Sequence, residues 1–120
     1  MNRDNFLNAI DFLEQLEPER FNFEIVREQT ECGTVACVLG WTPEIFGDSA
    51  HAYCIGHPVH ASDLYGVDPG IALRLFYPSH TRYAVWNTPE NAPGNKATPK
   101  EVAESLRRFL AWHDKQEDAK

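Results

Sequence analysis

The chain has 120 residues, which is the size of one domain, and its 42% hydrophobic and 24% charged residues are typical of a globular protein. A formal net charge of −7 disfavours binding to the phosphates of nucleic acids. No run approaches the ~20 apolar residues needed to cross a bilayer. Three cysteines leave no complete disulfide framework, and no signal peptide is evident at the N-terminus, so we expect a cytosolic protein.

The N-terminal segment has the period of an amphipathic helix. Its apolar residues recur at intervals of three and four positions, with polar residues between them. They are Phe6, Leu7, Ile10, Leu13 and Leu16. The spacing predicts a surface helix over residues 2–17, which Pro18 ends.

An alternating stretch follows over residues 21–26, and a second candidate strand lies at residues 82–86. Because a lone strand needs a partner, we predict at most a small two-stranded β-ribbon between these two segments. Residues 33–41 are small or aliphatic nearly all round, which predicts a central buried helix. Glu44 to Phe46 add a further helical turn before Gly47.

The second half of the sequence carries clear signals for helix ends. A short helix over residues 61–65 should end at Gly66, and Asp68-Pro69 should cap the next helix, which continues through Phe76. Thr98-Pro99-Lys100-Glu101 is a capping box that opens the last helix, and the charged tail 114–120 is expected to fray. The fold class predicted is therefore mainly α, a single domain of four or five helices over residues 1–120.

Acidic side chains are concentrated in the N-terminal quarter. Residues 1–31 hold eight acidic and three basic residues, whereas residues 98–120 hold five of each. Such a charge run is either a solvated helix face or a surface that docks on a basic partner. The second interpretation assigns partner binding to Asp4, Asp11, Glu14, Glu17 and Glu19.

Glu31 to Cys37 is the segment richest in reactive groups. Cys32 would lie at the start of the predicted buried helix, where free N–H groups stabilise a thiolate, and Cys37 would be buried inside it. The motif Cys-Gly-Thr-x-x-Cys-x-x-Gly, followed by Leu64-x-Gly66, an Ala-x-x-Leu-Phe at residues 72–76 and Thr98-Pro99, resembles a group of small uncharacterised bacterial and phage proteins. This resemblance covers about residues 21–110 and implies a shared fold, with no activity attached.

The same segment is similar, more weakly, to cysteine peptidases that trim the leader peptides of bacteriocins. Gln29, Glu31, Cys32 and Gly33 match the surroundings of their nucleophile in kind. Such an enzyme needs a histidine base, and His80 is the candidate. The spacing from Cys32 to His80 is much shorter than in those enzymes.

A zinc site is a third possibility, because thiols and imidazoles gather in the central third of the chain. Its candidate ligands are Cys32, Cys37, Cys54, His57 and His60. The competing interpretation has Cys37 packed as a small apolar group and both histidines in a solvated loop.

Without a complete catalytic set or a cofactor motif, the leading interpretation is a small acidic cytosolic protein that binds a protein partner with a basic surface. The resemblance implies a bacterial or phage origin. A phage accessory or anti-defence role is one concrete form of this binding function. A cysteine-dependent hydrolase using Cys32 and a small zinc-binding protein are the alternatives. Neither a nucleic acid nor a membrane is expected as a partner.

Overall fold

A computed structural model describes residues 1–22, 28–30, 33–35, 38, 41–47, 58–76 and 98–118. Its α-helices are α1 (Arg3–Gln15), α2 (Thr42–Phe46), α3 (Pro58–Tyr65), α4 (Pro69–Phe76) and α6 (Pro99–Asp118). A short 3₁₀-helix, η1 (Pro18–Arg20), and two strands, β1 (Glu28–Thr30) and β2 (Gly33–Val35), complete the described elements. The fold is mainly α, as the sequence predicts.

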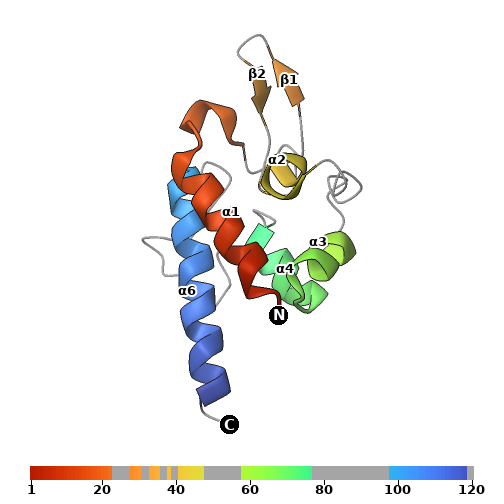
Figure 1. Cartoon of the computed structure of the whole chain (residues 1–120), viewed down its shortest axis with the longest axis vertical. Coiled ribbons are helices and arrows are strands. Elements are labelled where there is room, and N and C mark those ends of the chain that lie inside the picture. Colours follow the sequence, from red (N-terminus) through yellow and green to blue (C-terminus); the bar gives the residue numbers. More distant parts are fainter. Residues whose placement is uncertain are drawn as a thin grey trace.

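The two longest helices, α1 and α6, lie side by side and run in opposite directions (Figure 1). Each has one apolar face, and the two faces meet in the core. Phe6, Ala9 and Leu13 of α1 are fully buried, as are Leu106 and Phe109 of α6. The first and last described helices therefore pack against each other. Helix α6 extends to Asp118, which includes most of the segment 114–120 that the sequence predicts to fray.

A chain of aromatic rings connects this helix pair to the rest of the core. Phe6 lies between Phe109 of α6, at 5.3 Å, and Tyr65 at the end of α3, at 4.9 Å between ring centroids. Tyr65 then contacts Phe76 of α4 at 4.7 Å and Phe46 of α2 at 5.9 Å. The rings of Phe6 and Tyr65 therefore tie all five described helices to one core.

The predicted helix ends are confirmed where local signals marked them. Gly66 follows α3 with a positive φ of 65°, and the Asp68 carboxylate accepts a hydrogen bond of 2.7 Å from the N–H of Gly70 at the start of α4. The capping box of α6 closes in both directions. The Thr98 hydroxyl accepts from the Glu101 N–H at 3.2 Å, and the Glu101 carboxylate accepts from the Thr98 N–H at 3.0 Å.

The helix predicted over residues 33–41 is wrong at its start, and residues 36, 37, 39 and 40 lie outside the described residues. Gly33–Val35 form β2, which pairs antiparallel with β1 in the register Thr30↔Gly33. Thr34 and Val35 are β-branched, and residues of this type favour a strand over a helix. Farther on, the Trp41 N–H donates a hydrogen bond of 3.2 Å to the Val38 carbonyl.

A two-stranded β-ribbon pairs residues 28–30 with residues 33–35. The ribbon predicted between residues 21–26 and 82–86 lies mostly outside the described residues, which include neither 23–27 nor 82–86. The pairing that forms is local, which lowers the entropy cost of bringing two strands together.

Candidate functional site

The proposed acidic residues lie on the outer side of α1 and in the turn that follows it. Asp4 and Asp11 are exposed and stand seven residues apart, so they share one side of the helix about 10 Å apart along its axis. Glu17 and Glu19 are exposed at η1. Within the part of the chain that the structure describes, none of these four carboxylates makes an ion pair.

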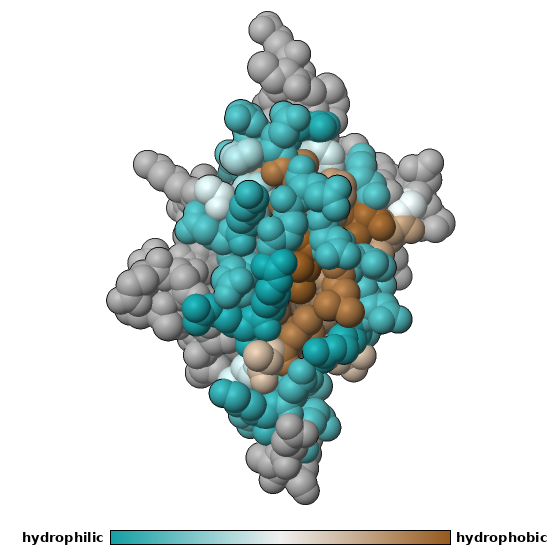
Figure 2. All heavy atoms as spheres, turned by 60° about the vertical axis from the view of Figure 1, so that its left-hand side comes forward, coloured by the Kyte–Doolittle hydropathy of each residue, from teal (hydrophilic) through white to brown (hydrophobic). Residues whose placement is uncertain are grey.

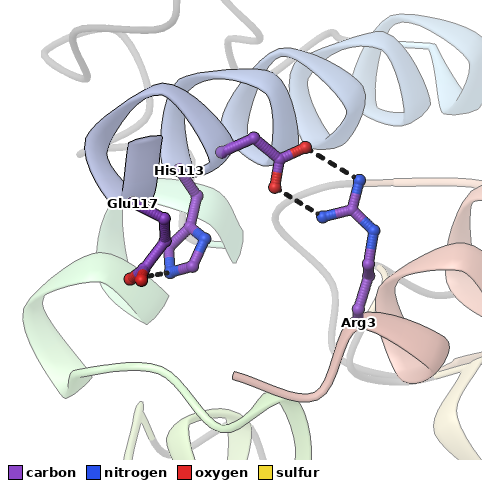
Figure 3. Close-up of polar contacts among 4 residues, drawn as sticks. Arg3, His113 and Glu117 are labelled. Atoms are coloured by element: carbon purple, nitrogen blue, oxygen red, sulfur yellow. Dashed lines mark hydrogen bonds and ion pairs between the residues drawn. The ribbon is translucent and has the colours of Figure 1, made fainter. Parts of the chain in front are cut away.

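Glu14 has a different role, because its carboxylate lies 2.5 Å from the guanidinium of Arg107 on α6. At the other end of the same helix pair, Arg3 forms a two-pronged ion pair with Asp114, with N–O distances of 2.8 and 3.0 Å (Figure 3). His113 and Glu117 approach each other to 3.7 Å on the next turn of α6. The Arg3–Asp114 and Glu14–Arg107 pairs join α1 to α6 and leave Asp4 and Asp11 as the charged residues of α1 outside the described ion pairs.

A groove of about 370 Å³ runs between α1 and α6, and we refer to it as the α1/α6 groove. Leu7, Ile10, Leu110 and Ala111 form its apolar wall, and Arg3, Asp11, Arg107 and Asp114 form its charged rim. Leu7 is 44% exposed and is, with Met1, one of the two large hydrophobic side chains left exposed among the described residues. Figure 2 shows an apolar band bordered by hydrophilic side chains on the side where α6 comes forward.

A second hollow of about 400 Å³ lies on the opposite side of α1, between α1, η1 and α2, and we refer to it as the Trp41 pocket. It is lined by Asp11, Phe12, Gln15, Leu16, Arg20, Trp41 and Glu44. The rings of Phe12 and Trp41 lie 5.5 Å apart, and the guanidinium carbon of Arg20 stands 5.1 Å from the centroid of the Trp41 ring. Trp41 is only 2% exposed, so its ring is almost entirely covered by its neighbours at the base of this pocket.

Asp11 lines both hollows. Asp11 lies on α1 between the two hollows, with Leu7 on the side of the α1/α6 groove and Phe12 on the side of the Trp41 pocket. A molecule that crosses α1 here would meet an apolar groove, a carboxylate and an aromatic pocket in succession. The sequence pointed to Asp11 through charge alone and gave no sign of the hollows, since these depend on how α2 and α6 pack against α1.

The cysteine and histidine hypotheses fall mostly outside the described residues. Cys32, Cys37, Cys54, His57 and His80 are not described, and of His60 only the backbone is. His60 lies in α3, so the expectation that it belongs to a loop is wrong. The proposed start of a helix at Cys32 is also wrong, because β2 begins at Gly33 and supplies no helix N-terminus there.

Among the side chains that are described, no three His, Cys, Asp or Glu residues stand close enough together to bind a metal ion. Of the described helices, none combines the length and apolar character needed to span a bilayer. No protein-family model matches the chain, and neither the curated proteins nor the solved structures contain a significant match to it.

Proposed function

We propose that this chain is a binding protein that recognises a protein partner with a basic surface, and that the α1/α6 groove and the adjacent carboxylates of α1 form the contact. The observation that carries the proposal is the exposed Leu7, placed between Asp4 and Asp11 at the edge of an apolar groove. Apolar side chains exposed beside unpaired charges are typical of interaction surfaces.

The chemistry of this surface selects the kind of partner. Arg3 and Arg107 on the rim are already paired with Asp114 and Glu14, so the charges left outward are negative. The complementary ligand is an amphipathic segment whose apolar side chains enter the groove while its lysines or arginines face Asp4 and Asp11. A phage accessory or anti-defence protein that acts on a basic host protein would use such a surface.

A synthetic amphipathic helix built from leucine and lysine is a direct probe, with a peptide carrying glutamate in place of lysine as its control. Binding is measured by NMR on the isotope-labelled protein. We expect the lysine peptide to shift the amides around Leu7, Asp11 and Ala111, and the glutamate peptide to shift none. Because exposed charges are screened within ~8 Å at physiological ionic strength, added salt should weaken the binding.

Variants separate the groove from general charge attraction. Leu7→Ser and the double variant Asp4→Asn/Asp11→Asn should each lower the affinity for the lysine peptide by about twofold to fivefold, which is the range for one exposed contact. The matched control is Glu17→Gln/Glu19→Gln, which removes the same charge outside the groove. Equal weakening by both double variants, or no effect of Leu7→Ser, would show that the groove is not the site.

A further inference from the structure

The Trp41 pocket already holds one stacked cation. The guanidinium of Arg20 lies over the Trp41 ring, at a distance typical of a cation–π contact. Phe12 borders the same floor, with its ring 5.5 Å from that of Trp41. Because Trp41 is 2% exposed, the aromatic surface that a second positively charged group could contact is that of Phe12, which is half-buried.

Its charge favours a second cation. Asp11 and Glu44 contribute two carboxylates and Gln15 an amide, against the single guanidinium of Arg20. Asp11 and Gln15 are exposed at the mouth, where an incoming side chain would meet them first. A side chain with an apolar stem and a delocalised charge matches this lining, because the stem can pack on Phe12 and Leu16 while the charge faces the carboxylates.

We propose that the Trp41 pocket binds one arginine side chain of the same protein partner. The inference rests on the proposed function and adds a specificity element to it. Because Asp11 borders both hollows, a partner segment that crosses α1 at this residue can place an apolar side chain in the α1/α6 groove and an arginine in the Trp41 pocket. Recognition then requires both groups in one segment, which selects against partners that are merely basic.

The first test uses a single side chain. N-acetylarginine amide is titrated into the full chain, and N-acetylcitrulline amide, its uncharged isostere, is the control. The arginine compound should shift the NMR signals of the Trp41 indole and the Phe12 ring, and citrulline should not. Glu44→Gln should weaken the binding of the arginine compound by about twofold to fivefold, whereas Asp63→Asn, which makes the same charge change on α3 outside the pocket, should leave this binding unaltered.

A second variant covers the case in which Glu44→Gln perturbs folding. Gln15→Lys puts a positive charge at the exposed mouth of the pocket and should abolish the arginine shifts, while the melting temperature stays within a few degrees of the parent. Equal shifts from arginine and citrulline, shifts confined to other acidic residues, or an unchanged response in Gln15→Lys would overturn the inference.

The two proposals fail separately. Suppose that Leu7→Ser weakens the leucine–lysine peptide but Gln15→Lys changes the response to neither ligand. The proposed function of the groove would then be supported, and the proposal that the Trp41 pocket binds arginine would be wrong. If instead Leu7→Ser has no effect on the peptide while arginine still binds beside Trp41, the pocket is a cation site and the proposed function is wrong.

Discussion

Gly66 occupies a position that strongly favours glycine. Its φ of 65° is in the left-handed region, and a Cβ built on it would stand 2.9 Å from the backbone N of Asn2 and 3.2 Å from Met1. Both contacts are with main-chain atoms next to the start of α1, where the Asn2 N–H also donates to the Tyr65 carbonyl. The end of α3 and the beginning of the chain therefore pack too closely for a side chain.

We expect Gly66→Ala to lower the free energy of unfolding by about 2–4 kcal/mol, from backbone strain together with displacement of the N-terminus. Gly47→Ala is the matched control, since Gly47 also has a positive φ, of 99°, but a Cβ there would meet nothing within 4 Å. It should cost about 1 kcal/mol. Urea unfolding of both variants measures the difference, and similar losses would mean that the contact with Asn2 contributes nothing.

Thr98 determines where α6 begins, through the two reciprocal hydrogen bonds with Glu101. Thr98→Ala removes the side-chain acceptor and should lower the free energy of unfolding by about 1 kcal/mol. Thr98→Ser keeps the hydroxyl and should stay close to the parent. Thermal unfolding followed by circular dichroism compares the two, and an alanine variant as stable as the serine variant would contradict the role of the cap.

At the scale of elements, two ion pairs align α1 with α6. Arg3–Asp114 and Glu14–Arg107 lie at opposite ends of the antiparallel pair. Since Arg3 and Asp114 are each about half exposed, at 47% and 50%, water and salt weaken their attraction. The two ion pairs thus contribute more to the alignment of α1 along α6 than to the free energy of unfolding.

A double-mutant cycle with Arg3→Ala and Asp114→Ala should give a coupling of about 0.2–1 kcal/mol, falling as salt is added. A parallel cycle between Arg3 and Glu101, which form no contact among the described residues, should be additive. Coupling of the same size in both cycles would show that the charges interact only through the overall field. Free energies from chemical denaturation supply the values.

How far the sequence predicts the fold depends on how local each signal is. Gly66, Asp68 and Thr98 mark helix ends through contacts within a few residues, and all three predictions are confirmed. The β1–β2 pair was missed because Glu31-Cys32 between the strands lacks the Asn-Gly or Asp-Gly signature of a two-residue turn. Small residues at 33–41 then fit a buried helix equally well, and periodicity alone does not separate the two.

At the scale of the whole molecule, the candidate site shows the same division. Charge along the chain identified Asp4 and Asp11, but it did not reveal that Glu14 is paired with Arg107, ninety-three positions away. The Trp41 pocket likewise joins Phe12, Arg20 and Glu44 from three separate elements. Residue type and spacing predict which groups are charged or apolar, whereas the packing of α2 and α6 on α1 decides which of them face each other.

Phe6 is the residue on which that packing depends most directly. It is fully buried, and its ring contacts Phe109 of α6 and Tyr65 of α3, so one side chain joins three helices. Phe6→Ala should lower the free energy of unfolding by about 3–5 kcal/mol, because it removes apolar contacts and leaves a cavity. Since domains of this size are stable by about 5–15 kcal/mol, the variant should lose a large part of its stability.

Leu7→Ala is the natural control, because Leu7 follows Phe6 in the sequence but points to solvent, with 44% of its surface exposed. Leu7→Ala should lower the free energy of unfolding by no more than about 0.5 kcal/mol, as most surface substitutions do. Guanidinium unfolding of the two variants gives the comparison. A small loss in Phe6→Ala would mean that the α1, α3 and α6 contacts do not depend on this ring. A large loss in Leu7→Ala would mean that the groove wall supports the fold, rather than being left open for a partner.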